Sequence, residues 1–280
     1  MSFGIGKDFT SSRDGKKSSV ELLIDDCHNH GAITVTSATS YTTEDAAWQK
    51  HIGGVVGILY GSDKGVTVSN SSNEATIHST AKGTGETRIA GIVAHTRYGN
   101  IEVSSCTNNG EVKSTGEATN ARPAGIISVT NAATKLDIKQ CYNKGLISSS
   151  ATVGTFFSGG IVAYLLGPAT VSECYNQGEV KVTAAGGETK IGGIAGQAEK
   201  VTIEKSYNQN KVSFSASKQP RMGGIVGNIV QNVTIDNCHN DTNGVVECTV
   251  AGATTCVGGL VGRLAGQSTV IRNSSNSCAV

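Results

Sequence analysis

A five-residue phrase returns eight times along this chain, and this repetition limits the possible fold more than any other feature. Its fullest form is Cys-Tyr-Asn-Lys-Gly at residues 141–145. Every copy has Asn at its third position, and successive copies begin 32 to 44 residues apart. The eight asparagines are Asn29, Asn73, Asn108, Asn143, Asn176, Asn208, Asn240 and Asn276. A period of this length predicts a stack of equivalent units rather than an ordinary globular core.

Each repeat unit carries two further landmarks. An alternating apolar pair precedes the phrase, as in Ile101 and Val103, and another apolar residue follows it, as in Val112. A Gly-Gly-apolar element occurs once per unit, for example at residues 191–196. The chain has 36 Gly and only 5% aromatic residues, and small and β-branched residues dominate. These patterns predict three short β-strands per unit, separated by turns.

We therefore predict an all-β fold, a right-handed parallel β-helix (β-solenoid) of about eight coils with three short strands each. Residues 1–280 would form one domain, with a longer loop insertion at 37–51. Equivalent residues of successive coils would lie above one another, about 4.8 Å apart. The eight asparagines would form a hydrogen-bonded ladder. The Gly after each Asn would take the left-handed conformation, and the Cys or Ser that opens the phrase would point inward.

The combination of Gly-Gly-Ile-x-Gly with Cys-Tyr-Asn-x-Gly-x-Val resembles the GLUG repeat, from Phe3 to Val280. GLUG repeats occur in bacterial surface proteins and beside the catalytic part of immunoglobulin A peptidases. The resemblance implies a right-handed parallel β-helix on an exported or cell-surface protein, often an adhesin. It implies no peptidase activity, because the zinc-peptidase motif His-Glu-x-x-His is absent from this sequence.

Composition argues against several functional classes. The 23 basic and 22 acidic residues give a net charge of +1, and the basic residues are scattered, so we expect no nucleic-acid partner. We expect no membrane span, because no apolar run approaches the roughly 20 residues that a span needs. The N-terminal residues show no signal peptide. Cys27, His28 and His30 lack a Cys-x-x-Cys partner, so we predict no metal site and no cofactor.

Two groups of outward residues are candidates for function. Glu102 and Asp137 would lie on adjacent coils, as the carboxylate pair of a polysaccharide lyase or glycosidase would require. The same column has Thr at 67, 170, 202 and 234, an interrupted row that also admits ice binding. The 37–51 insertion contains Tyr41 and the only Trp, Trp48, and insertions on one side of a solenoid often carry binding. A loop that covers the end of the core is the alternative.

The cysteines and the chain ends leave further alternatives. Neighbouring Cys106, Cys141 and Cys174 would aim the same way, which suits free thiols better than disulfides. Cys248 and Cys256 flank one loop and are placed to bridge in an oxidising environment, and Cys278 occupies the slot that Gly fills in other copies. Neither end of the repeat array shows a cap. Exposed strand edges of this kind predict either further repeats or end-to-end self-association.

The sequence therefore favours a non-enzymatic structural or adhesive module of a cell-surface or secreted protein. Such a module would present loops or a sheet face to a glycan or to a host or surface protein. The alternatives are a subunit that assembles through its uncapped ends and a β-helix polysaccharide lyase or glycosidase that uses the outward carboxylates.

Overall fold

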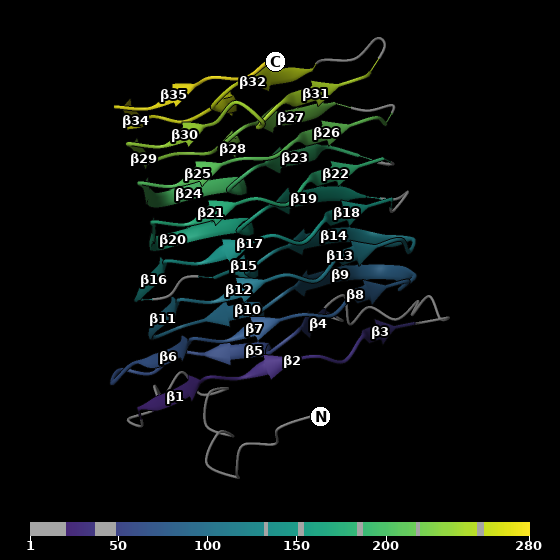
Figure 1. Ribbon diagram of the computed structural model, residues 1–280, viewed down its shortest axis with the longest axis vertical. Helices are drawn as coiled ribbons and strands as arrows, with labels where there is room; N and C mark the ends of the chain where they lie inside the picture. Colours follow the sequence, from purple (N-terminus) through teal and green to yellow (C-terminus); the bar gives the residue numbers. More distant parts are fainter. Residues whose placement is uncertain are drawn as a thin grey trace.

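The chain folds into stacked coils of short β-strands. The computed structural model describes residues 21–36, 49–131, 134–150, 154–183, 187–216, 219–250 and 255–280. Within these ranges there is no helix, and the strands of successive coils pair in parallel along one axis, from purple to yellow in Figure 1. The predicted all-β, parallel β-solenoid is therefore confirmed.

Four sheets, which we name A to D, run the length of the stack. Sheet A has 13 strands: β1 (Leu22–Asp25), β5 (Val56–Tyr60), β6 (Val66–Ser69), β10 (Val93–Arg97), β11 (Asn100–Ser104), β15 (Ile127–Thr130), β16 (Lys135–Lys139), β20 (Val162–Ser172), β24 (Ala195–Glu204), β28 (Val226–Ile229), β29 (Val233–Asp236), β33 (Val261–Leu264) and β34 (Val270–Arg272). Sheet B has eight two-residue strands: β2 (His28–Asn29), β7 (Ser72–Asn73), β12 (Thr107–Asn108), β17 (Tyr142–Asn143), β21 (Tyr175–Asn176), β25 (Tyr207–Asn208), β30 (His239–Asn240) and β35 (Ser275–Asn276).

Sheets C and D close each coil. Sheet C has seven strands: β3 (Ile33–Val35), β8 (Ile77–Ser79), β13 (Val112–Ser114), β18 (Ile147–Ser149), β22 (Val180–Val182), β26 (Val212–Phe214) and β31 (Val246–Cys248). Sheet D has seven strands: β4 (Lys50–Gly53), β9 (Gly83–Ala90), β14 (Ala118–Ala124), β19 (Thr155–Gly159), β23 (Thr189–Gly192), β27 (Pro220–Gly223) and β32 (Cys256–Gly258). One coil passes through sheets D, A, B and C in that order.

The number of coils and the number of strands per coil differ from the prediction. The solenoid makes about six turns, because six coils contribute to all four sheets while β1–β3 and β32–β35 belong to partial coils. Each complete coil has four or five strands rather than three. Sheet A has two arms, which are separate strands in most coils and one continuous strand in β20 and β24.

The Gly-Gly element, which we predicted as a strand, is a turn between sheet D and sheet A. In one coil, Gly159 ends β19 and Val162 begins β20. A Cβ on Gly159 would lie 2.0 Å from the carbonyl oxygen of Val162, and a Cβ on Gly160 would lie 2.2 Å from Cγ of Asn176. Both positions therefore require glycine. A side chain at residue 159 would collide with the backbone of the turn, and one at residue 160 would collide with Asn176 across the interior.

The asparagine ladder is confirmed, and it runs through the interior of the stack. The Nδ2 of each Asn donates a hydrogen bond to Oδ1 of the Asn in the next coil, over 2.7 to 2.8 Å, from Asn29 to Asn276. In most coils Nδ2 also donates to the carbonyl two residues ahead, as Asn143 does to Gly145 at 3.0 Å. Because the ladder packs on the Gly column, it separates one apolar cluster beside sheet A from another between sheets C and D.

The left-handed residue of the corner lies elsewhere than predicted. The residue before each opening Cys or Ser has a φ between 48° and 54°, and none of these residues is Gly: Asp26, Asn70, Ser105, Gln140, Glu173, Lys205, Asn237 and Asn273. The Gly after the ladder Asn does not have a positive φ. It is Gly for a different reason, since a Cβ on Gly145 would lie 2.0 Å from the carbonyl oxygen of Gly110 in the neighbouring coil.

The inward cysteine column is confirmed in the complete coils. Cys106, Cys141, Cys174 and Cys238 are buried, and all eight cysteines of the chain are free thiols. Each buried thiol donates to the carbonyl two residues earlier, as Cys106 does to Ser104 at 3.2 Å. Burial raises the pKa of the Cys141 thiol well above its ordinary value. These thiols are therefore inert core groups, and no Cys248–Cys256 bridge is present.

Candidate functional site

The two aromatic residues predicted to bind a ligand, Tyr41 and Trp48, lie outside the described residues. Of the 37–51 insertion, the structure describes residues 49–51, and Lys50 and His51 begin sheet D. The binding role of Tyr41 and Trp48 therefore stays a prediction.

The outward carboxylates do lie on adjacent coils, as predicted. Glu102 pairs in register with Asp137 across β11 and β16. Lys139 Nζ lies 3.0 Å from Oε1 of Glu102, and Lys135 Nζ lies 2.7 Å from Oδ2 of Asp137. Partial burial alone would raise the pKa of Glu102, but hydrogen bonds from Lys139 and Ser104 outweigh it and leave the pKa below its ordinary value. A general acid needs the opposite shift, so this pair is poorly placed for glycoside chemistry.

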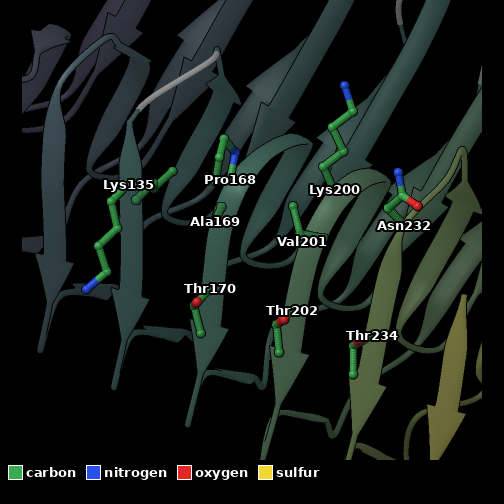
Figure 2. A pocket seen from close by; sticks show the side chains of 10 residues that line it. Lys135, Pro168, Ala169, Thr170, Lys200, Val201, Thr202, Asn232 and Thr234 are labelled. Carbon is green, nitrogen blue, oxygen red and sulfur yellow. The ribbon is translucent and has the colours of Figure 1, made fainter. Parts of the chain in front are cut away.

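Next to Asp137, the outer face of sheet A has a hollow of about 450 Å³ that spans β16, β20, β24 and β29. Figure 2 shows Thr170, Thr202 and Thr234 in a row on neighbouring strands, while Lys200 and Asn232 extend from the bends above them. The three threonines are register partners in successive coils. They are half-buried, and their hydroxyls make no hydrogen bond within the part of the chain that the structure describes. We call this surface the threonine hollow.

The bend of each coil between the two arms of sheet A forms the upper rim of the threonine hollow. Lys200 and Asn232 occupy the left-handed region there, with φ of 57° and 53°. The coils approach closely at this bend, because a Cβ on Gly167 would lie 1.9 Å from the carbonyl oxygen of Lys200. The floor is small and apolar, with Ala169 and Val201 almost fully buried. The recess therefore offers free hydroxyls above an apolar floor, a surface less suited to ice than a flat threonine array would be.

A second outward feature is an aromatic column on sheet B. Tyr142, Tyr175, Tyr207 and His239 stack with ring centroids 5.1 to 5.2 Å apart. Because the rings cover one another's faces, only their edges and hydroxyls point outward, and a sugar could not stack on the faces within the column. Beside it, Gln177, Gln209 and Asp241 form a hydrogen-bonded row, and these three residues line a hollow of about 490 Å³ together with Thr242 and Asn243. This column mainly stabilises the contact between coils.

A third feature, which sequence reasoning missed, is a row of charged side chains where sheet D meets the first arm of sheet A. We call it the charged seam. Glu86 joins two coils, with Oε2 2.7 Å from Nη2 of Arg88 and Oε1 2.6 Å from Nε of Arg122. Further along, Glu188 pairs with Lys190 at 3.1 Å and also with Arg221. Each cluster therefore has two cations for one anion.

Aromatic rings lie between the two ionic clusters of the charged seam. The Arg122 guanidinium lies 4.8 Å from the ring centroid of Phe157 and 5.1 Å from that of Tyr164. Lys190 Nζ lies 4.3 Å from the Phe157 centroid on the other side. Burial lowers the pKa of both Arg122 and Lys190, against the carboxylates that raise it. The cation–π contacts offset part of the desolvation of these cations.

Two imidazoles occupy the N-terminal part of the charged seam. His51 and His95 stack with centroids 5.0 Å apart, and Nη1 of Arg88 donates to Nδ1 of His95 at 2.6 Å. Burial, reinforced by the charge of Arg88, lowers the pKa of His51 to about 4 and that of His95 to about 2. Both rings are therefore neutral at pH 7, which is the form that fits beside a buried guanidinium.

The sequence does contain a signal for the charged seam. The phrases Gly-Glu-Thr-Arg-Ile and Gly-Glu-Thr-Lys-Ile occur at residues 85–89 and 187–191, each just before a Gly-Gly-type turn. The position two residues before that turn forms one column in the structure: His51, Arg88, Arg122, Phe157, Lys190, Arg221 and Cys256. Because this column contains several residue types, it is harder to recognise in the sequence than the position that is Asn in every copy.

Other classes of site find little support among the described residues. Within those ranges, no group of three or more His, Cys, Asp or Glu side chains is arranged to hold a metal ion. His28 is engaged instead with Asp26 and Ser72, each at 2.9 Å. The same part of the chain has no helix with the length and apolar character needed to cross a membrane.

Comparisons with protein-family models, with curated proteins and with solved structures found no match. The structure has the architecture of a β-helical repeat protein, but no family model supports the resemblance to GLUG repeats.

Proposed function

We propose that this chain is a non-enzymatic structural or adhesive module of a cell-surface or secreted protein. The observation that carries the proposal is the continuity of the stack. The sheets and the asparagine ladder link neighbouring coils from Asn29 to Asn276. Such a body is stiff along its axis because each coil is fixed by two neighbours. It presents long outer faces on which a glycan or a surface protein could be bound.

The enzymatic alternative has weaker support. The outward carboxylates are held in ion pairs with lysines, and the pKa of Glu102 is shifted in the wrong direction for a general acid. The threonine hollow contains no carboxylate among its lining residues. The proposed module therefore binds without transforming its ligand and needs no cofactor.

The surface location rests on the repeat itself. The Gly-Gly-Ile-x-Gly and Cys-Tyr-Asn-x-Gly-x-Val phrases are those through which the sequence resembles bacterial surface repeats. The end-to-end association considered above stays a prediction. Its measurement is sedimentation of the purified chain over a range of concentrations, where growth of long particles would favour assembly over a monomeric rod.

A glycan array and a surface-protein capture assay test the proposal. We expect the purified chain to bind a limited set of immobilised glycans or one exposed protein, and to leave soluble oligosaccharides of the bound class unchanged in length. Shortening of those oligosaccharides would contradict the non-enzymatic assignment. Complete absence of binding in both assays would remove the adhesive role and leave a purely structural one.

A further inference from the structure

The threonine hollow contains three hydroxyls that the fold itself does not use. Thr170, Thr202 and Thr234 occupy the same register position in three successive coils. None of the three makes a hydrogen bond within the described ranges. A hydroxyl can donate one hydrogen bond and accept two, so the row offers a complete set of partners for ligand hydroxyls.

The spacing of the three hydroxyls is set by the stacking of the coils. Neighbouring strands lie about 4.8 Å apart, so the hydroxyls repeat at that interval along the solenoid axis. This interval is close to the length of one sugar residue in an extended polysaccharide. A glycan that lies along the axis would therefore place one sugar above each coil, and every sugar would meet an equivalent hydroxyl.

The floor of the threonine hollow suits the apolar side of a sugar ring. Pro168, Ala169 and Val201 line it without a charged group, and the recess holds about 450 Å³. Figure 2 shows Ala169 and Val201 between the threonine row and the bend, where Pro168, Lys200 and Asn232 lie. A sugar could rest its C–H groups on this floor while its hydroxyls reach the threonines on one side and Lys200 or Asn232 on the other.

The charged groups around the threonine hollow leave no excess of positive charge, which favours an uncharged ligand over an acidic one. Lys135 is paired with Asp137 at 2.7 Å, and Lys200 lies 3.8 Å from Oε1 of Glu199. Glu204 and Asp236 follow the threonines along β24 and β29. An acidic polysaccharide would meet no excess of positive charge here, so electrostatics give it no advantage.

We infer that the threonine hollow binds an extended, uncharged polysaccharide along the solenoid axis, with one sugar residue over each of the three coils that carry Thr170, Thr202 and Thr234. This inference rests on the proposed adhesive function and names its ligand class. Because one sugar residue meets one coil, binding strengthens with the length of the glycan up to a trisaccharide and changes little beyond it.

The test uses the full chain and a series of uncharged β-1,4-linked gluco-, xylo- and manno-oligosaccharides, from the monosaccharide to the hexasaccharide, in calorimetric titrations. The central variant is Thr202→Val, which keeps the β-branched shape and removes only the hydroxyl. We expect it to weaken binding of the trisaccharide about five- to tenfold, the effect of one lost hydrogen bond. Thr67→Val is the matched control, because Thr67 occupies the same column outside the hollow.

The outcomes separate this inference from the proposed function. Equal weakening by Thr67→Val and Thr202→Val, or affinity that keeps rising beyond the trisaccharide, would overturn the one-sugar-per-coil arrangement. Stronger, salt-sensitive binding of polygalacturonate than of the uncharged series would overturn the ligand class. Binding on a glycan array that persists unchanged in Thr202→Val would place the adhesive site elsewhere and leave the proposed function intact. Thermal unfolding of both variants checks that each one is folded.

Discussion

Replacing Asn143 with alanine should break the interior ladder near the middle of the stack. Asn143 is fully buried. It accepts a hydrogen bond from Asn108 at 2.8 Å, and it donates to Asn176 at 2.8 Å and to the carbonyl of Gly145 at 3.0 Å. The substitution removes all three bonds and leaves a donor of Asn108, the Oδ1 of Asn176 and the Gly145 carbonyl without these partners.

The expected loss of unfolding free energy follows from those orphaned groups. A buried polar group without a partner costs about 1 to 3 kcal/mol, and neighbouring losses are not additive, so we expect about 3 to 5 kcal/mol for Asn143→Ala. Asn143→Asp tests the hydrogen bonds apart from volume, because aspartate has the same shape but cannot donate to Asn176. It should destabilise the chain at least as strongly. Asn276→Ala is the control, since Asn276 is exposed and water replaces its bonds.

Urea denaturation followed by far-ultraviolet circular dichroism measures these differences. Hydrogen exchange adds a local readout, because the amides of the coils on either side of Asn143 should exchange faster in Asn143→Ala than in the unmodified chain, whereas the rates near Asn276 should change little. A loss below about 1 kcal/mol for Asn143→Ala, or an equal loss for Asn276→Ala, would refute the reasoning, since buried and exposed members of the ladder would then be equivalent.

Three further substitutions have calculable outcomes in thermal or urea unfolding. Lys205→Gly should raise the unfolding free energy by up to about 1 kcal/mol, because Lys205 is exposed and has a φ of 48°, which glycine adopts without strain. Lys113→Gly, in the extended strand β13, should lower the unfolding free energy. A decrease in unfolding free energy for Lys205→Gly would contradict this reasoning. Gly160→Ala should destabilise the chain by at least about 2 kcal/mol or prevent folding, because the new Cβ would lie 2.2 Å from Cγ of Asn176. Gly57→Ala is the milder comparison, since the nearest atom to its Cβ is 3.3 Å away. A near-neutral effect of Gly160→Ala would argue against the packing of this glycine on Asn176. The pKa of His51 is lowered to about 4, so the unfolded chain binds a proton before the folded one as pH falls below 6.5. Stability should therefore fall between pH 6.5 and 4, by up to about 3 kcal/mol from this group, and His51→Gln should flatten that slope in urea titrations.

The spacing of one residue type was sufficient to predict the stacking of the coils. Once Asn143 and Asn176 are placed above one another, the register of every strand in the repeat follows, and with it the inward position of Cys141 and Cys174. The positions of Glu102 and Asp137 on adjacent coils were predicted in the same way. What spacing cannot give is the shape of the coil between the landmarks.

The errors arose where backbone geometry, rather than side-chain pattern, determines the structure. Gly-Gly-Ile has the composition of a strand with flexible residues, yet Gly159 and Gly160 are required by contacts that exist only after the coil closes. The left-handed corner falls on Gln140 and its equivalents, which carry no glycine to mark it. The charged seam escaped notice because its column includes His51, Phe157 and Cys256 as well as cations.

In a stacked fold, each outward position of the repeat forms a column along the surface. A change of residue type within such a column marks a surface that the repeat itself does not require. The column that contains Leu23 and Thr67 changes to carboxylates at Glu102 and Asp137 and then to three threonines. The carboxylates are neutralised by lysines, whereas the threonines line a recess and make no bond within the described ranges. Stability of the stack needs neither feature, because the ladder and the apolar columns hold the coils together from inside. The free hydroxyls are therefore available for a ligand without any cost to the fold, which is why the inferred polysaccharide site is tested best at Thr202.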